Sequence, residues 1–234
     1  MRSFLAAVGL FAVSVSLSLP AKAQSIVVVE LYTSQGCSSC PPADDLLSEV
    51  SVREDVLALG LHVDYWDYLG WEDDLAQPEF TKRQALFNTN MKSRYRLVTP
   101  QMIFQGRDYV AGAKRAKALE YIDMLAAEPE KAELTLTRNG TEIVISVRPR
   151  AGASIPGDLH VVRYMPEVSR DILRGENADR KIVYTNTVMA WDTVAEWDGT
   201  SELRASYTAS AEGEFAVILQ AKNIGPVLAA RKVK

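Results

Sequence analysis

The sequence has few of the residues from which metal centres and disulfide networks are built, with two cysteines and two histidines in 234 residues. A closed zinc site usually needs about four nitrogen or sulfur ligands, so this class of site is disfavoured. Repeats, low-complexity tracts and a basic tail are also absent, and the formal net charge is −4. This acidic balance argues against nucleic-acid binding. A hydrophobic content of 47% indicates instead one or two packed cores.

Long apolar runs are also scarce, and the one that exists lies at the N-terminus. Arg2 precedes an apolar run over residues 4–19, which ends in the small-x-small pattern of residues 20–24. The run is shorter than the roughly 20 apolar residues of a membrane-spanning helix, and three serines interrupt it. We therefore expect a signal peptide over residues 1–23, a periplasmic or secreted location, and no stable membrane insertion of the mature chain.

The two cysteines, Cys37 and Cys40, can pair only with each other within the chain. Closing so short a loop restrains the unfolded chain by only roughly 2 kcal/mol, which makes stabilisation a weak reason for a disulfide. An inert disulfide and a two-thiolate site for a soft metal such as Cu(I) stay open as alternatives, although no Met or His lies within the motif. An oxidising compartment and this spacing favour reversible dithiol–disulfide chemistry.

The residues around the cysteines predict a strand, a tight loop and a helix. Residues 25–32 are almost continuously apolar and rich in β-branched side chains, which is typical of a strand buried on both faces. Prolines at 41–42 suit a first helical turn, and apolar side chains follow at helical spacing. Because free N–H groups and the helix dipole stabilise a thiolate, we expect Cys37 to be the nucleophile and the more exposed of the two cysteines.

The rest of the first half completes a small α/β domain. Strands are expected over 56–63, 101–105 and 107–111, and helices over 78–91 and 114–127. The expected order over residues 24–128 is therefore βαβαββα. A mildly basic stretch, comprising Lys82, Arg83, Lys92, Arg94 and Arg96, has the default interpretation of a solvated helix face.

The second half, residues 129–234, changes to alternating apolar and polar residues. A hairpin pattern surrounds residues 138–141. Further strands are expected over 158–164, 181–190, 201–209, 215–221 and 226–232. About seven short strands predict a β-rich, sandwich-like domain. Because the boundary at residues 128–130 is short, we expect a fixed interface between the halves.

The order of elements, the C-x-x-C at the first helix and Thr99-Pro100 before the hairpin together resemble the thioredoxin fold. This resemblance implies a cis bond before Pro100 and a role for Thr99 and Pro100 in holding a substrate segment beside the dithiol. More narrowly, residues 33–44 and 62–67 are similar to a family of secreted bacterial thioredoxin-like proteins of unassigned function. Ordinary thioredoxins have Trp where Gly36 stands, and Gly-Pro where residues 38–39 are Ser-Ser.

Polar and aromatic residues after the second strand are candidates for the rim of the site, because parallel strands end at a shared edge. They are Asp64, Tyr65, Trp66 and Asp67. The alternative is that the aromatic rings cover the core and the aspartates cap turns. His62 fits a core or hydrogen-bonded histidine better than a catalytic base.

Glu176 and Asn177 belong to a polar pattern in the second half that resembles the same secreted family. They either reach the dithiol face or serve in structural hydrogen bonds.

The function predicted from the sequence is a thiol–disulfide oxidoreductase in which Cys37 and Cys40 are catalytic. Its partners would be a protein or small disulfide substrate and an external electron donor or acceptor, with no bound organic cofactor, no metal and no nucleic acid. The alternative is a non-catalytic thioredoxin-like binding module for a protein partner or a soft metal ion. Burial of both sulfurs would support that alternative.

Overall fold

The computed structural model describes residues 25–152 and 154–234. The expected signal peptide, residues 1–23, lies outside them. The strands of the first half are β1 (Val27–Thr33), β2 (Val56–His62), β3 (Gln101–Phe104) and β4 (Asp108–Ala111). Its helices are α1 (Pro41–Ser51), the 3-10 helix η1 (Asp67–Leu69), α2 (Pro78–Asn90) and α3 (Arg115–Ala126). The βαβαββα order predicted from the sequence is confirmed.

The second half consists of strands, as predicted. They are β5 (Ala132–Asn139), β6 (Glu142–Pro149), β7 (Gly157–Ile172), β8 (Arg180–Trp197), β9 (Leu203–Thr208), β10 (Glu214–Ala221) and β11 (Val227–Lys232). Three of these strands form a separate sheet in the order β5-β6-β9. The other four join the first half in one eight-stranded sheet with the order β11-β10-β7-β8-β2-β1-β3-β4.

The junction between the halves is the parallel contact of β2 with β8. Gly60 and Thr187 form the residue pair that joins them. A Cβ on Gly60 would lie 3.3 Å from the carbonyl oxygen of Thr185, so the two backbones approach more closely than most side chains permit. A single sheet therefore runs from the dithiol half into the β-rich half.

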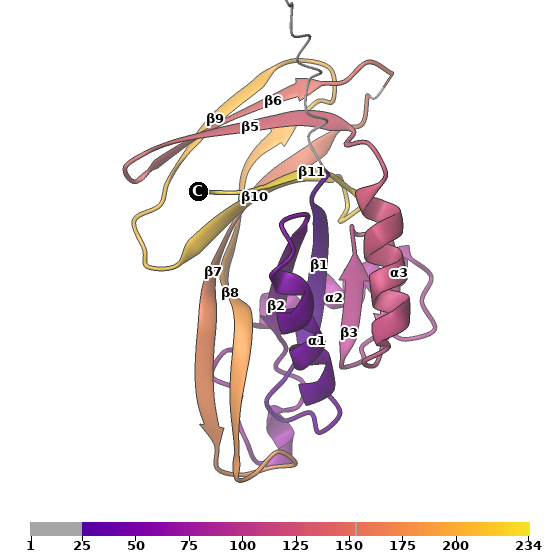
Figure 1. Ribbon diagram of the computed structural model, residues 1–234, viewed down its shortest axis with the longest axis vertical. Helices are drawn as coiled ribbons and strands as arrows, with labels where there is room; N and C mark the ends of the chain where they lie inside the picture. Colours follow the sequence, from indigo (N-terminus) through magenta and orange to yellow (C-terminus); the bar gives the residue numbers. More distant parts are fainter. Residues whose placement is uncertain (1–24, 153) are drawn as a thin grey trace, which may run out of the picture.

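Helices α1 and α3 lie in front of the eight-stranded sheet in Figure 1, and α2 lies behind it. Three apolar clusters hold the helices and the two sheets together. On one face of the sheet, α1 and α3 pack against β1 through residues such as Val29, Leu47 and Ile122. On the other face, α2 packs on both halves, because Phe87 shares a cluster with Val162 and Ile218. The three-stranded sheet covers β7, β10 and β11.

The basic stretch over residues 82–96 is not uniformly solvated, because Arg83 on α2 is buried. Its guanidinium donates two 2.8 Å hydrogen bonds to the carboxylate of Glu30 on β1 and one of 2.9 Å to Oε1 of Gln220 on β10. The guanidinium also lies over the ring of Trp191, 3.9 Å from the ring centroid. The expectation of a solvated helix face was wrong at this position, because a carboxylate in the middle of an apolar strand needs a buried partner.

Strands β7 and β8 are much longer than the sequence predicts, with 16 and 18 residues. In β7 the residues after Tyr164 are mostly exposed or partly exposed, so the apolar pattern ends before the strand does. In β8 the part not predicted is residues 191–197, at the end away from the hairpin tip, where most residues are also exposed or partly exposed. Together they form a hairpin that runs beside α1 and ends near the start of that helix (Figure 1). This hairpin brings residues of the second half to the dithiol.

Within the described residues, no helix is both long enough and apolar enough to cross a membrane.

Candidate dithiol site

Cys37 and Cys40 form a disulfide at the N-terminus of α1. Cys40 is the N-cap residue, and its carbonyl oxygen accepts hydrogen bonds from the N–H groups of Ala43 (2.8 Å) and Asp44 (3.1 Å). Cys37 is 2% exposed and Cys40 is fully buried, whereas Ser38 and Ser39 are exposed. Both cysteines are thus enclosed in the disulfide form, and the expected difference in their exposure is small.

The Thr99–Pro100 peptide bond is cis, as the resemblance to thioredoxins implied. Trp66 connects this bond to the dithiol loop. Its indole Nε1 donates a 2.6 Å hydrogen bond to the Thr99 hydroxyl, and its Cβ lies 3.1 Å from where a Cβ on Gly36 would be. Gly36 therefore leaves room for an aromatic side chain that comes from the loop after β2.

The side chains of Asp64, Tyr65 and Asp67 form hydrogen bonds with groups outside the dithiol loop. Asp64 accepts a 2.6 Å hydrogen bond from the hydroxyl of Thr81 on α2, and Tyr65 donates one of 3.2 Å to Gln84 on the same helix. Asp67 accepts the backbone N–H of Asp73 at 3.1 Å. The first two contacts fix the loop after β2 to α2, and the third joins two residues of that loop.

A series of buried hydrogen bonds links the dithiol loop to β2. One carboxylate oxygen of Asp73 accepts the backbone N–H of Gln35 at 2.8 Å and lies 2.8 Å from Nδ1 of His62. The side chains of Asp73 and His62 are both fully buried. This position fits the hydrogen-bonded core histidine favoured from the sequence, with Asp73 holding its ring in place.

The side chain of Gln35 extends this series of hydrogen bonds toward the surface. Its amide group donates a 2.9 Å hydrogen bond to Asp74, and its Oε1 accepts one of 2.7 Å from the indole of Trp71. Asp74 also accepts a 2.8 Å bond from Arg170 on β7. The loop before the cysteines is thus fixed by one loop, between η1 and α2, and by one strand, β7, that lie far from it in sequence.

Asp44, in the first turn of α1, lies in the same buried region. Burial raises the pKa of its carboxyl to about 7, while the charge of His62 and the hydroxyl of Thr33 act in the opposite direction. Tyr184 on β8 lies edge-on to the His62 ring, with 4.5 Å between ring centroids. Burial also raises the pKa of the Tyr184 phenol, and the charges of Asp44 and Asp73 add to the shift. Buried ionisable groups therefore surround the start of α1.

The tip of the β7–β8 hairpin lies directly on the dithiol loop. The amide group of Asn177 donates 2.9 Å hydrogen bonds to the carbonyl oxygens of both Gln35 and Cys37. The carboxylate of Glu176 accepts the backbone N–H of Ser38 at 3.3 Å. The two polar residues singled out in the second half therefore contact the site by hydrogen bonds.

Sequence reasoning missed Gln35, Trp71, Asp73 and Asp74 as parts of the site. They contact one another only once the loop between β2 and α2 folds back over the residues before Cys37. An available indication was the acidic pair at residues 73–74 in an otherwise mixed loop. Pairing it with Gln35 requires the three-dimensional structure.

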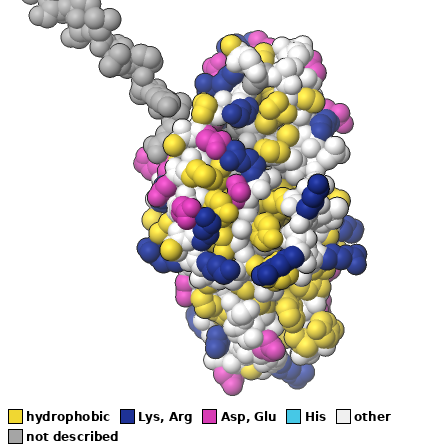
Figure 2. Space-filling model, turned by 90° about the vertical axis from the view of Figure 1, so that its right-hand side faces the viewer, with side chains coloured by type: hydrophobic (Ala, Val, Ile, Leu, Met, Phe, Trp, Pro, Cys, Tyr) yellow, Lys and Arg dark blue, Asp and Glu magenta, His cyan; other side chains and the backbone are white. Residues whose placement is uncertain are grey.

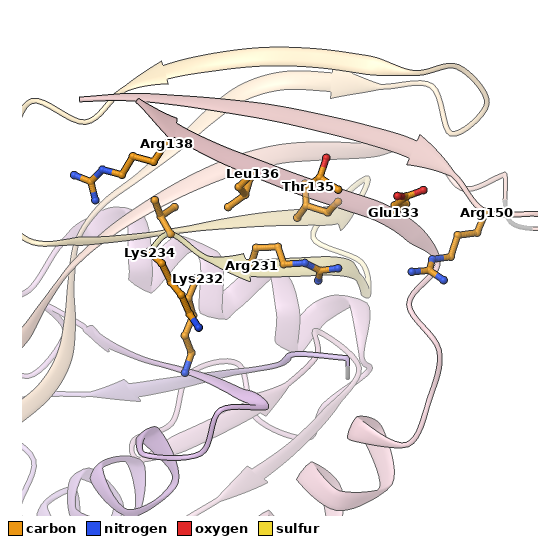
Figure 3. Close-up of a pocket in the computed structure, with 10 residues that line it drawn as sticks. Glu133, Thr135, Leu136, Arg138, Arg150, Arg231, Lys232 and Lys234 are labelled. Atoms are coloured by element: carbon orange, nitrogen blue, oxygen red, sulfur yellow. The ribbon is translucent and has the colours of Figure 1, made fainter. Parts of the chain in front are cut away.

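A groove lies between β5 and β11, at the opposite end of the molecule from the dithiol site (Figure 3). It has a volume of about 710 Å³ and is lined by basic side chains that include Arg138, Arg150 and Arg231. Arg150 and Arg231 both pair with the carboxylate of Glu130, which neutralises part of this charge. Neither cysteine nor histidine lines the groove, so it is separate from the dithiol site.

The surface and side-chain clusters give little sign of other sites. In Figure 2, hydrophobic, basic and acidic side chains are interspersed over one face, unlike the uniformly basic face of many nucleic-acid-binding proteins. In the part of the chain that the structure describes, no group of three or more His, Cys, Asp or Glu residues is arranged to hold a metal ion. The dithiol loop is therefore the principal candidate.

Comparisons with known proteins agree with this fold. The chain is similar to protein AGR_C_4864 of Agrobacterium tumefaciens, target AtR35, with 33% identity, a TM-score of 0.78, and coverage of 91% of this chain and 96% of that one. It shares the fold of HBP35 of Porphyromonas gingivalis, with 13% identity, a TM-score of 0.63, and coverage of 90% and 75%. No curated protein matches the chain. Residues 28–220 match the model of the family described as "Protein of unknown function (DUF1223)", to which this thioredoxin-like chain therefore belongs.

Proposed function

We propose that this protein is a thiol–disulfide oxidoreductase that acts in the periplasm or outside the cell. The observation that carries the proposal is the Cys37–Cys40 disulfide at the start of α1, with the cis Thr99–Pro100 bond connected to its loop through Trp66. Helix N-termini stabilise thiolates, and the contacts of Trp66 link the Thr99–Pro100 segment to the loop that carries Cys37.

In the reduced protein, the Cys37 thiolate attacks one sulfur of a substrate disulfide. The substrate S–S bond breaks, one substrate thiolate leaves and takes a proton from water, and a mixed disulfide forms. Cys40 then loses its proton and attacks the Cys37 sulfur, which releases the second substrate thiol and forms the Cys37–Cys40 disulfide. An external dithiol reduces the protein again. The same steps in reverse oxidise a substrate dithiol and need an external electron acceptor.

The Cys40→Ser variant tests this function in cells, because it leaves the mixed disulfide unresolved. We expect covalent complexes that disappear on reduction and whose partners are identified by mass spectrometry. Cys37→Ser is the matched control and should trap nothing. If neither variant traps a partner and the purified protein does not accelerate reduction of a model disulfide, the oxidoreductase proposal fails.

The enclosure of both cysteines favours a second candidate, a non-catalytic binding module for a protein partner or a soft metal ion. A structural disulfide of that kind has a reduction potential below roughly −300 mV and resists the glutathione pool. Equilibration of the purified protein with glutathione buffers separates the two candidates. Reversible reduction in the range of known exchange proteins supports the enzyme, and resistance to reduction supports the module.

A further inference from the structure

The β7–β8 hairpin places two different polar groups on the dithiol loop. Asn177 is 1% exposed, and its amide group holds the backbone carbonyls on either side of Gly36. Glu176 is exposed, and its carboxylate occupies the N–H of Ser38, the residue directly after Cys37. One side chain fixes the shape of the loop, and the other brings a negative charge to it.

Two contacts beside the tip hold the hairpin in this position. Arg170 pairs with Asp74, which is bonded to Gln35. A Cβ on Gly175 would lie 3.2 Å from the Cβ of Trp71, whose indole is bonded to the same glutamine. The tip is therefore held near the loop by two residues that precede Asn177.

The charge of Glu176 affects the two redox states differently. In the disulfide form the loop is uncharged at its sulfurs, and the Ser38 N–H bond to a carboxylate is a favourable charge-assisted contact. Reduction creates a Cys37 thiolate next to Ser38. The thiolate is then repelled by Glu176, and a backbone N–H that would otherwise stabilise it is already occupied.

We propose that Glu176 and Asn177 are positioning residues that together form a redox-sensitive latch, which favours the disulfide form of this site over the dithiol form. The latch rests on the proposed dithiol chemistry, and it deepens that function by assigning the redox equilibrium to a hairpin from the second half. Asn177 fixes the oxidised loop, and Glu176 disfavours the thiolate.

The test is the redox equilibrium of the full mature chain carrying Glu176→Gln. This variant keeps a side-chain oxygen that accepts the Ser38 N–H but removes the charge. The reaction with glutathione is balanced: the protein disulfide and two glutathione thiols give the protein dithiol and one glutathione disulfide. We expect its equilibrium constant to rise three- to tenfold, which corresponds to roughly 15–30 mV in reduction potential.

The same variant should lower the pKa of the Cys37 thiol in the reduced protein, which is measured from the pH dependence of its alkylation rate. The matched control is Asp171→Asn, which removes one charge from an exposed position of the same hairpin. An equilibrium constant and an alkylation profile that are unchanged in Glu176→Gln overturn the proposal, as does an equal shift in Asp171→Asn.

The variant Asn177→Ala gives a second, independent test of the latch. Loss of its two hydrogen bonds should raise the equilibrium constant in the same direction, and an unchanged or lowered constant contradicts the latch. These equilibria are measured without any protein substrate. If Glu176→Gln shifts the equilibrium, but no partner is trapped and reduction of a model disulfide is not accelerated, the oxidoreductase is rejected and the latch is kept. The reverse set of results does the opposite.

Discussion

The two halves of the molecule bury very different kinds of side chain. In the first half, buried polar groups gather around and below the dithiol, among them Gln35, Asp44, His62 and Asp73. Among the described residues, the second half contains four buried polar or charged residues, which are His160, Asn177, Thr187 and Gln220. The first half therefore has a buried polar network around its disulfide, whereas the core of the second half is mostly apolar.

Three of those four exceptions face the first half. Asn177 bonds to the dithiol loop, Gln220 to Arg83, and Thr187 pairs with Gly60 at the sheet junction. Buried polar groups cost free energy unless they are paired, so the hydrogen-bonded side chains of Asn177 and Gln220 show where the second half makes specific contacts, whereas Thr187 meets Gly60 through its backbone. The strand-rich half is therefore fitted to the dithiol half at defined points.

The largest effect on stability is expected when residues 24–128 are expressed alone, without the second half. The fragment loses β8 from the edge of β2 and loses Val162, Val188 and Ile218 from the cluster around α2. We expect an insoluble product, or one without a cooperative unfolding transition, as measured by circular dichroism during heating. A soluble fragment with the thermal transition of the 24–234 chain would show that the halves are independent.

A smaller loss of stability is expected from Arg83→Leu, which leaves the buried carboxylate of Glu30 without its ion-pair partner. Removing one partner of a buried ion pair typically costs about 3–5 kcal/mol in the free energy of unfolding. Urea denaturation measures the loss. The double variant Glu30→Leu/Arg83→Leu is the control and should recover much of the stability, because no unpaired charge remains. A single variant as stable as the wild type contradicts the role of this pair.

The pH dependence of stability tests the buried carboxyl of Asp44. Its folded pKa is raised to about 7 from an ordinary value of 3.8, so between these values the folded state holds a proton that the unfolded state has lost. Stability from this group is full below about pH 4 and is lost as pH rises through 7, by at most about 4 kcal/mol. Urea unfolding from pH 4 to 8 should show this fall in the wild type and a flatter curve in Asp44→Asn. Parallel curves contradict it.

The smallest expected effect concerns Trp66. Trp66→Phe keeps an aromatic ring beside Gly36 but removes the hydrogen bond to Thr99, which should cost about 1 kcal/mol. If Trp66 also aligns the cis-proline loop with the dithiol, disulfide exchange with glutathione should slow. Thr81→Val, which removes the bond to Asp64, is the control and should lose similar stability with no change in exchange rate. Equal exchange rates in both variants would limit Trp66 to a structural role.

Much of the first half could be predicted because its signals are local. The β-branched run of β1, the prolines at the start of α1 and the apolar spacing of that helix lie within a few residues of the cysteines. The cis bond before Pro100 followed from a resemblance in which the order of elements matched. Local propensity and a known arrangement of elements agree there.

The missing parts depend on contacts between distant residues. The distal half of β7 exposes residues such as Glu167 and Asp171, so this strand has no continuous apolar pattern beyond Tyr164. The attachment of β8 to β2 involves a single residue pair, but Gly60 inside an apolar strand was an available sign of a close backbone approach. The network of Gln35 and Asp73 likewise joins residues 38 positions apart.

The place of β2 in the sheet has a consequence during biosynthesis. Its two neighbours are β1, which the ribosome makes before it, and β8, which ends 135 residues after His62. At roughly 5–20 residues per second, a nascent chain carries β2 for about 7–27 s before its second partner exists. All seven residues of that strand are buried in the finished protein. Until β8 arrives, β2 is an apolar edge of the kind that pairs with other chains, so the growing polypeptide needs protection from its neighbours.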